Sequence, residues 1–214
     1  MVELLIGIAV GLLIAAAAAS FLANNLRESR ALLLESRLMQ DLRTAADLIT
    51  RELRRAGYWA AASEGIWQAG AGGVQQNPYT AVSPSAAASD SVSFNFSRDA
   101  FENGHVDTNE QFGFRLHNGA IEMLLGTSNW QALTDSATLT VTAFSVTPTV
   151  QEVSLDAACP RDCAPGSATC PPRISVRSLA LRLSGRSATD PNVVRTVRSN
   201  VRLRNDTLAG ACAV

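Results

Sequence analysis

The four cysteines are the residues of this 214-residue chain with the most evident chemistry. They are Cys159, Cys163, Cys170 and Cys212. Residues 159–170 also contain two prolines and a glycine, and this loop has no secondary structure to support it. An even number of cysteines in such a region is typical of disulfides formed in an oxidising compartment, and four cysteines allow three pairings. Zinc sites more often have closely spaced cysteine pairs or histidine ligands, and neither His105 nor His117 is near in sequence. We therefore expect two disulfides, with zinc or free thiols as less favoured alternatives.

An acidic segment before the cysteines offers oxygen ligands for calcium. Its members are Asp99, Glu102, Asn103, Asp107, Asn109 and Glu110. Calcium takes about six to eight oxygen ligands. The segment lacks the D-x-[DN]-x-[DN]-G spacing of an EF-hand loop. We expect a polar loop without a metal, and calcium is the less favoured alternative.

Charge is unevenly distributed along the chain, although the formal net charge is only −1. Residues 57–172 contain eleven acidic residues and three arginines, whereas residues 173–214 contain eight arginines and two aspartates. Arg198, Arg202 and Arg204 fall on the outward face of a predicted strand, an arrangement that nucleic acid can bind. No aromatic residue alternates with them to stack on bases. We favour a solvated face, or pairing with the acidic middle of the chain, over nucleic acid.

Motifs for catalysis are missing from the sequence. It contains no G-x-S-x-G, H-E-x-x-H, P-loop or G-x-G-x-x-G pattern, and its two histidines are the only candidates for a histidine general base. We expect neither an enzyme nor a cofactor.

The elements that must position these residues begin with an apolar segment at the N-terminus. No polar side chain occurs in residues 4–19, and the apolar character continues to Ala23. About 20 helical residues, each rising 1.5 Å, span a bilayer core. A cleavable secretory signal has a basic leading segment, whereas no basic residue precedes Arg27. We expect residues 1–23 to form a membrane or filament helix that the rest of the chain does not need for folding.

The charges that follow this segment conflict with the cysteines. Arg27 and Arg30 would hold their side of the helix in the cytoplasm by the positive-inside rule. Disulfides require the opposite side of the membrane. A basic leader before Met1 in a precursor would reconcile the two observations.

Residues 24–57 continue the helix with an amphipathic pattern. Large apolar residues recur at helical spacing, at Leu38, Leu42, Ile49 and Leu53. Arg54 and Arg55 precede Gly57 in the way that basic residues precede a helix-ending glycine, so we expect the helix to end near Ala56. The four apolar residues should pack on the domain that follows.

Residues 58–214, which we call the head, predict a β-rich domain. Residues 60–90 predict long loops, including Gly70-Ala71-Gly72-Gly73. Strands are expected at 92–96, 112–116, 120–124, 137–147, 174–184 and 193–204. Asn118-Gly119 is a strong signal for a hairpin. A long helix followed by antiparallel strands is an α+β fold.

Two segments resemble a known superfamily. Val2-Glu3-Leu4-Leu5-Ile6-Gly7 and the Leu/Ala/Val-rich helix after it resemble the mature N-terminus of type IV pilins and of type II secretion pseudopilins. Met1 and Val2 match the apolar residues that these proteins place before a glutamate. Residues 42–58 resemble the helix end of PilW-like minor pilins, and residues 201–205 resemble both PilW and GspJ-type pseudopilins. The middle of the chain resembles neither.

This resemblance implies a pilin-like fold, processing by a prepilin peptidase with N-terminal methylation, and an assembly role for Glu3. In that superfamily the glutamate pairs with the N-terminal amine of a neighbouring subunit, whereas on its own a carboxylate in a first turn is simply favoured by the helix dipole. We expect a minor pilin that initiates or caps a type IV pilus. Its partners would be other pilins and a tip adhesin, and it would move from the inner membrane, with a periplasmic head, into an extracellular filament. A GspJ-like pseudopilin and a membrane-anchored periplasmic binding protein are the alternatives.

Overall fold

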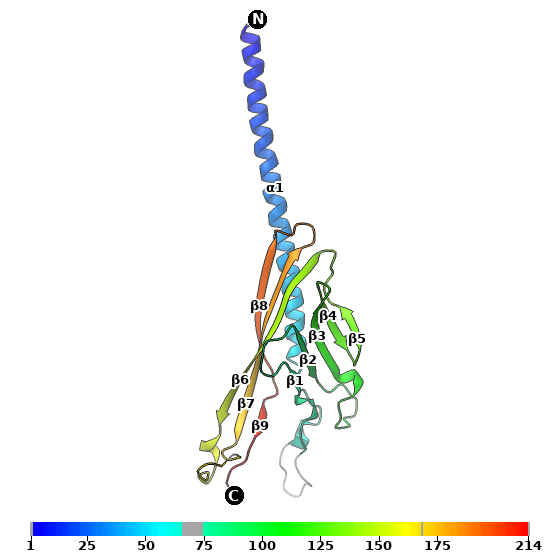
Figure 1. Cartoon of the computed structure of the whole chain (residues 1–214), viewed down its shortest axis with the longest axis vertical. Coiled ribbons are helices and arrows are strands. Elements are labelled where there is room, and N and C mark those ends of the chain that lie inside the picture. The colour runs from blue at the N-terminus through cyan, green and yellow to red at the C-terminus, as the bar shows by residue number, and fades with distance from the viewer. Residues whose placement is uncertain (1, 66–74, 168, 214) are drawn as a thin grey trace.

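The computed structural model of the chain describes residues 2–65, 75–167 and 169–213. The one α-helix of this described part, α1 (Val2–Leu53), forms a rod whose C-terminal third lies against the head (Figure 1). Short 3-10 turns occur at η1 (Ala62–Gly65), η2 (Pro78–Thr80), η3 (Thr108–Glu110) and η4 (Asp156–Ala158). The strands are β1 (Val82–Ser83), β2 (Ser91–Asn95), β3 (Gln111–His117), β4 (Ala120–Leu125), β5 (Asn129–Ala132), β6 (Leu139–Ser154), β7 (Arg173–Ser187), β8 (Val194–Arg202) and β9 (Thr207–Ala209). The glycine-rich residues 70–73 lie outside the described residues.

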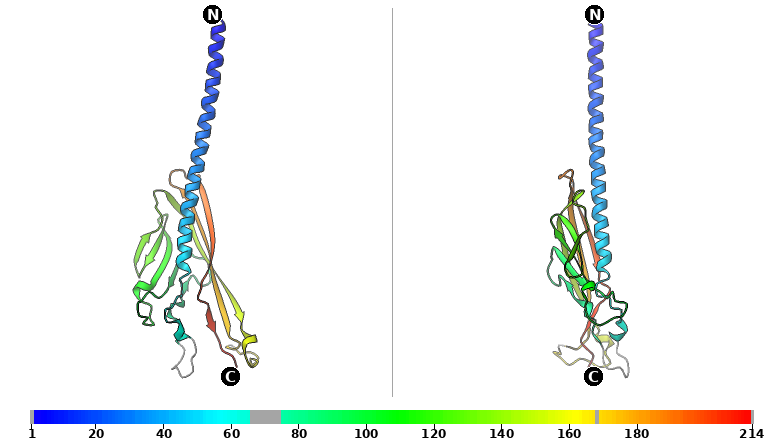
Figure 2. Two further views of the ribbon diagram at one scale, coloured as in Figure 1. Left: turned by 180° about the vertical axis from the view of Figure 1, so that it is seen from behind. Right: turned by 90° about the vertical axis from the view of Figure 1, so that its right-hand side faces the viewer.

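The strands form two antiparallel sheets. The first has the order β1-β2-β3-β4-β5, and the second has the order β6-β7-β8 with β9 also paired to β7. An isolated bridge between Ser89, just before β2, and Val146 of β6 links the sheets, and the N–H of Val141 also donates to the carbonyl of Gly119 at 2.7 Å. Figure 2 shows both sheets beside the lower part of α1, with the upper part of the helix standing clear of them.

A shared core joins the helix to both sheets. Leu42, Ile49 and Leu53 of α1 are 0% exposed. They belong to one buried cluster with four phenylalanines of the first sheet and three leucines of the second, namely Phe94, Phe96, Phe112, Phe114, Leu179, Leu181 and Leu183. Leu38 lies at the upper edge of the same cluster. The α+β class expected from the sequence is confirmed.

The helix ends three residues before the expected Ala56. The residues after Leu53 continue in tighter turns, with N–H groups of Arg55 and Ala56 bonded three residues back, to Glu52 and Leu53. Gly57 has a φ of +75°, a conformation that glycine adopts without the steric cost of a side chain. Its N–H donates to the carbonyl of Asn95 at the end of β2 at 2.8 Å, so the turn directs the chain onto the first sheet.

The strand pattern agrees with the sequence in the hairpins and differs at the strand ends. Asn118 (φ +49°) and Gly119 (φ +75°) form the two-residue turn between β3 and β4, as predicted. Strand β6 runs to Ser154, seven residues past its expected end, because β7 continues to pair with it. Strand β8 ends at Arg202, so Arg204 lies outside the strand in which we expected it. The short strands β1, β5 and β9 were not predicted.

We predict that the two halves of α1 differ sharply in their effect on head stability. Leu42→Ala with Ile49→Ala removes two fully buried side chains and should lower the free energy of unfolding by about 2–5 kcal/mol for each substitution. Leu12→Ala with Leu13→Ala removes side chains that are 66% and 71% exposed and should leave it unchanged. Thermal melting of the detergent-solubilised full chain, followed by near-UV circular dichroism, measures both. Equal destabilisation by the two pairs would contradict this division of the helix.

Candidate assembly site

The first part of α1 is an apolar surface that nothing in the described chain covers. Every residue from Val2 to Leu33 is exposed, and the most apolar 18-residue window has a mean hydropathy of 2.5 with none of it buried. By length and composition this helix can cross a membrane. Apolar area of this size is unfavourable in water, so lipid or other helices must cover it.

Among residues 2–26 of this surface, Glu3 has the one ionisable side chain. It lies in the first turn of α1 and is exposed, where the unsatisfied N–H groups of the helix favour a negative charge. Once the surrounding helix is covered by hydrocarbon, a carboxylate without a partner costs several kcal/mol. The site can therefore hold a cation or an amine presented by another molecule.

An ion pair fixes the point at which α1 leaves the head. The guanidinium of Arg195 in β8 donates through Nε to Glu35 Oε1 at 3.0 Å, and its NH2 group also contacts that oxygen. The hydrogen bond from Arg195 holds the pKa of the Glu35 carboxyl below its usual range. The pair joins residues 160 positions apart, so no local pattern in the sequence indicates it.

A ribbon of strands, which we call the distal arm, carries the disulfides at the end of the head opposite the N-terminus (Figure 1). It consists of residues 147–154 of β6, residues 173–178 of β7, and β9. Cys159 pairs with Cys212 and Cys163 pairs with Cys170, so one bond closes a loop at the tip and the other attaches the C-terminal tail to it. Val150 and Val153 in the arm are 49% and 42% exposed. The arm thus has little core, and the cross-links take over part of the stabilisation that a core would supply.

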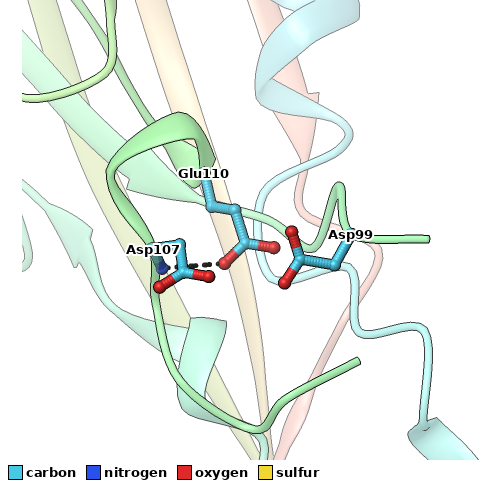
Figure 3. A group of neighbouring side chains, drawn as sticks. All are labelled: Asp99, Asp107 and Glu110. Carbon is cyan, nitrogen blue, oxygen red and sulfur yellow. Dashed lines mark hydrogen bonds between the residues drawn. The ribbon is translucent and has the colours of Figure 1, made fainter. Parts of the chain in front are cut away.

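Three acidic side chains from the acidic segment, for which calcium was the less favoured alternative, come together in the structure. Carboxylate oxygens of Asp99, Asp107 and Glu110 lie within 4.8 Å of one another (Figure 3). Loss of hydration at Asp99, and then the nearby charges of Glu110 and Asp107, raise the pKa of the Asp99 carboxyl. Asn103 lies beside this group and donates its amide to Asp107 at 2.8 Å. Asn109 is on the adjoining η3 turn.

Glu110 is already engaged by protein donors. It is 0% exposed, and its two oxygens accept N–H groups from Arg98 at 2.8 Å and Asp107 at 2.9 Å. The hydroxyl of buried Tyr79 lies 3.0 Å from Glu110 and 2.9 Å from Glu102, and burial together with these carboxylates raises the pKa of Tyr79. These donors satisfy the buried carboxylate, so the arrangement works as a brace for the loop.

Sequence reasoning missed both Tyr79 and Arg177 as structural residues. Arg177 in β7 donates to the carbonyl of Thr80 at 2.6 Å and to that of Asn205 at 3.2 Å, and its burial lowers the pKa of the guanidinium. It therefore holds the segment before β1 and the segment before β9 against the same strand. Isolated residues of this kind carry no spacing signal.

Comparison with known proteins places the chain in a family. A family model described as prepilin peptidase-dependent protein B matches residues 31–203, which covers most of the chain. The chain belongs to this family. No curated protein and no solved structure matches it. Members of the prepilin peptidase-dependent protein B family are related to type IV pilins, and an apolar N-terminal helix that anchors a soluble head in a membrane agrees with that relationship.

We predict that Asp99→Asn raises the melting temperature of the protein at pH 7. The folded-state pKa of Asp99 is raised, so the folded protein binds more protons than the unfolded chain and loses stability as the pH rises through that window. Asn carries no charge at any of these pH values, so the variant does not lose this stability. The difference in melting temperature between variant and parent should shrink as the pH falls below the raised pKa of Asp99.

Asp47→Asn on the exposed face of α1 is the matched control, and it should not change the melting temperature. Melting in EDTA and in calcium chloride should give the same curve for the parent protein. A calcium-dependent rise that Asp99→Asn abolishes would contradict the brace and support a cation site.

Proposed function

We propose that the protein is a minor pilin that assembles through α1 into a type IV pilus, where it initiates or caps the filament. The observation that supports this most directly is the length of α1 that the head does not cover. Residues 2–33 are exposed, whereas a bilayer core covers about 20 helical residues. About 12 residues, close to 18 Å of helix, therefore extend beyond the lipid without contact with the head.

This additional segment contains polar and charged residues between Asn24 and Arg30, but it also carries exposed leucines. Leu26, Leu32 and Leu33 are 55%, 66% and 70% exposed. A protein that only needed a membrane anchor would have no use for exposed leucines outside the bilayer. Packing against apolar helices of neighbouring subunits covers both the membrane-length part and this extension, which favours a filament subunit over an anchored binding protein.

Glu3 fits the same scheme as a device that sets the register between subunits. When helices bundle without water, pairing of the carboxylate with the N-terminal amine of a neighbour offsets the cost of burying both charges. A shift of one helical turn, about 5.4 Å, would separate the pair and leave two unpaired charges in an apolar bundle. Pairing between Glu3 and the neighbouring amine thus favours one register between adjacent helices over the others.

Processing and location follow from the same proposal. A prepilin peptidase would remove a leader ahead of the apolar helix, and the head would then face the periplasm until assembly moves it to the cell surface. The description of the family supports dependence on that peptidase. The protein would have no enzymatic activity or cofactor of its own, and its partners would be other pilins and a tip adhesin. A GspJ-like place in a secretion system is the second form of this proposal, and co-purification with secretion pseudopilins instead of pilins would identify it.

We predict that Glu3→Ala leaves the protein in the inner membrane but lowers its recovery in sheared filaments at least tenfold. The apolar helix still partitions into lipid, while the pairing that sets the register is lost. Immunoblots of membrane and filament fractions measure both quantities. Glu28→Ala, which removes an exposed carboxylate farther along α1, is the control and should assemble normally. Normal recovery of Glu3→Ala would remove the register role.

We also predict that Leu32→Ser with Leu33→Ser lowers recovery in filaments without releasing the protein from the membrane. These leucines lie beyond the part of the helix that lipid covers, so the change affects only contact with other subunits. The head should melt at the temperature of the parent protein, because both side chains are exposed. Ser36→Ala with Arg37→Gln alters the neighbouring exposed positions as a control. Unchanged recovery of the leucine variant would show that the extension is not an assembly surface.

A further inference from the structure

The outer face of the second sheet is a continuous basic surface. It is the face directed away from α1, and four of its arginines are exposed, Arg182 and Arg186 in β7 and Arg198 and Arg202 in β8. The other residues on this face of the two strands include Ser178, Ala180, Ser184, Thr196 and Asn200. No acidic residue of β6, β7 or β8 lies on it.

Two of these arginines lie directly opposite each other. The register of β7 and β8 pairs Arg182 with Arg198. Residues in this relation have Cβ atoms about 4.5–5.5 Å apart, and like charges there destabilise a sheet. In the described part of the chain no ion pair involves Arg182, Arg186 or Arg198, whereas Arg202 contacts Asp206 at 2.7 Å. The pair therefore weakens the isolated head, and a ligand with negative charge would relieve the repulsion.

The sequence left three interpretations of these arginines, namely a solvated face, pairing with the acidic middle of the chain, and nucleic-acid binding, and the strand register bears on all three. We had placed Arg204 on this face, but β8 ends before it, and Arg182 and Arg186 take its place. Pairing with the acidic middle does not occur here, since among the described residues Arg173 and Glu152 form the one ion pair between residues 57–172 and residues 173–214. Of the four arginines on this face, Arg202 is paired with Asp206, and the charges of the other three are not neutralised by an ion pair among the described residues.

The arginines occur at three levels along the strands. Arg202 lies at the level of Ser178, Arg182 and Arg198 share the next level, and Arg186 lies at the level of Val194. Successive levels are four residues apart, or about 13 Å at 3.3 Å per residue. The major groove of B-DNA is about 12 Å wide, so guanidinium groups at neighbouring levels can reach phosphates on its two sides. Arginine is suited to this task because its planar fork binds phosphate oxygens in pairs.

The same face lacks the features that other nucleic-acid surfaces use. It has no aromatic side chain on which unpaired bases would stack, and a broad sheet face does not enter a groove to contact base edges. We propose that the outer face of β7 and β8 binds the phosphate backbone of duplex DNA without regard to sequence. This inference does not rest on the proposed place of the protein in a filament.

Salt dependence of binding to a random-sequence duplex of 30 base pairs tests the proposal. The full chain in a non-ionic detergent is titrated into fluorescein-labelled duplex between 50 and 200 mM salt. Four phosphate contacts predict a slope of log affinity against log salt of about −3 to −4, which is roughly a 100-fold loss over this range. Arg182→Gln with Arg198→Gln should make the slope less steep by about 2 and weaken binding at least tenfold at 100 mM salt.

Arg43→Gln with Arg54→Gln, the helix variant, is the matched control, because it removes two exposed arginines from α1 and the turn directly after it instead. It should bind as the parent does, and the sheet variant should melt no lower than the parent, since it removes a repulsion. A single strand of the same length should bind more weakly than the duplex. The proposal is overturned if the sheet variant and the helix variant bind alike, if polyglutamate competes as well as duplex DNA, or if the parent shows no salt-dependent binding.

Discussion

The contact between the C-terminal third of α1 and the two sheets supports everything else in this molecule. In the described part of the chain, backbone hydrogen bonds join the sheets at two places, the bridge between Ser89 and Val146 and the bond from Val141 to Gly119, so the buried side chains provide most of the contact. Leu42, Ile49 and Leu53 pack on the second sheet and belong to one buried cluster that includes side chains of both sheets. The same helix continues as an exposed rod, so the element that completes the head also carries the surface through which we propose that the protein assembles. The ion pair between Glu35 and Arg195 lies at the boundary between the exposed part of α1 and the part that packs on the head.

The sequence predicts those parts of the structure that depend on neighbours along the chain. The apolar helix, the amphipathic spacing from Leu38 to Leu53 and the Asn118-Gly119 hairpin all arise from local periodicity or local backbone conformation, and the α+β class follows from them. The first and last residues of the strands are less predictable. Strands β6 and β7 are long because each pairs with the other along its whole length, and the propensities of their own residues do not indicate this. The disulfide pairing was open among three choices and needed the geometry of the tip.

The features that sequence reasoning missed are contacts between distant residues. Tyr79 reaches Glu110 across 31 positions, Arg177 reaches Thr80 across 97, and Glu35 reaches Arg195 across 160. The local patterns predict the helix and strands that carry most of these residues, but they do not indicate which distant residue each polar side chain contacts. The pairing of Arg182 with Arg198 is similar, because a register must be known before two arginines can be placed opposite each other. Polar contacts of this kind define the surfaces of the head, whereas apolar spacing defines its core.

The bond between Cys159 and Cys212 has a mechanical consequence. It joins the end of the chain to the tip of the distal arm, so residues 159–212 form a covalently closed ring that includes β7, β8 and β9. A pulling force applied at the tip is then carried by β6 and by the ring together, along the length of the strands. Hydrogen bonds in antiparallel sheets run perpendicular to the strands, so a force along the strands loads many of these bonds at once in shear. A force on a free tail would instead break them one after another. The tip of the head is thereby suited to bearing tension that reaches it along the axis of the molecule.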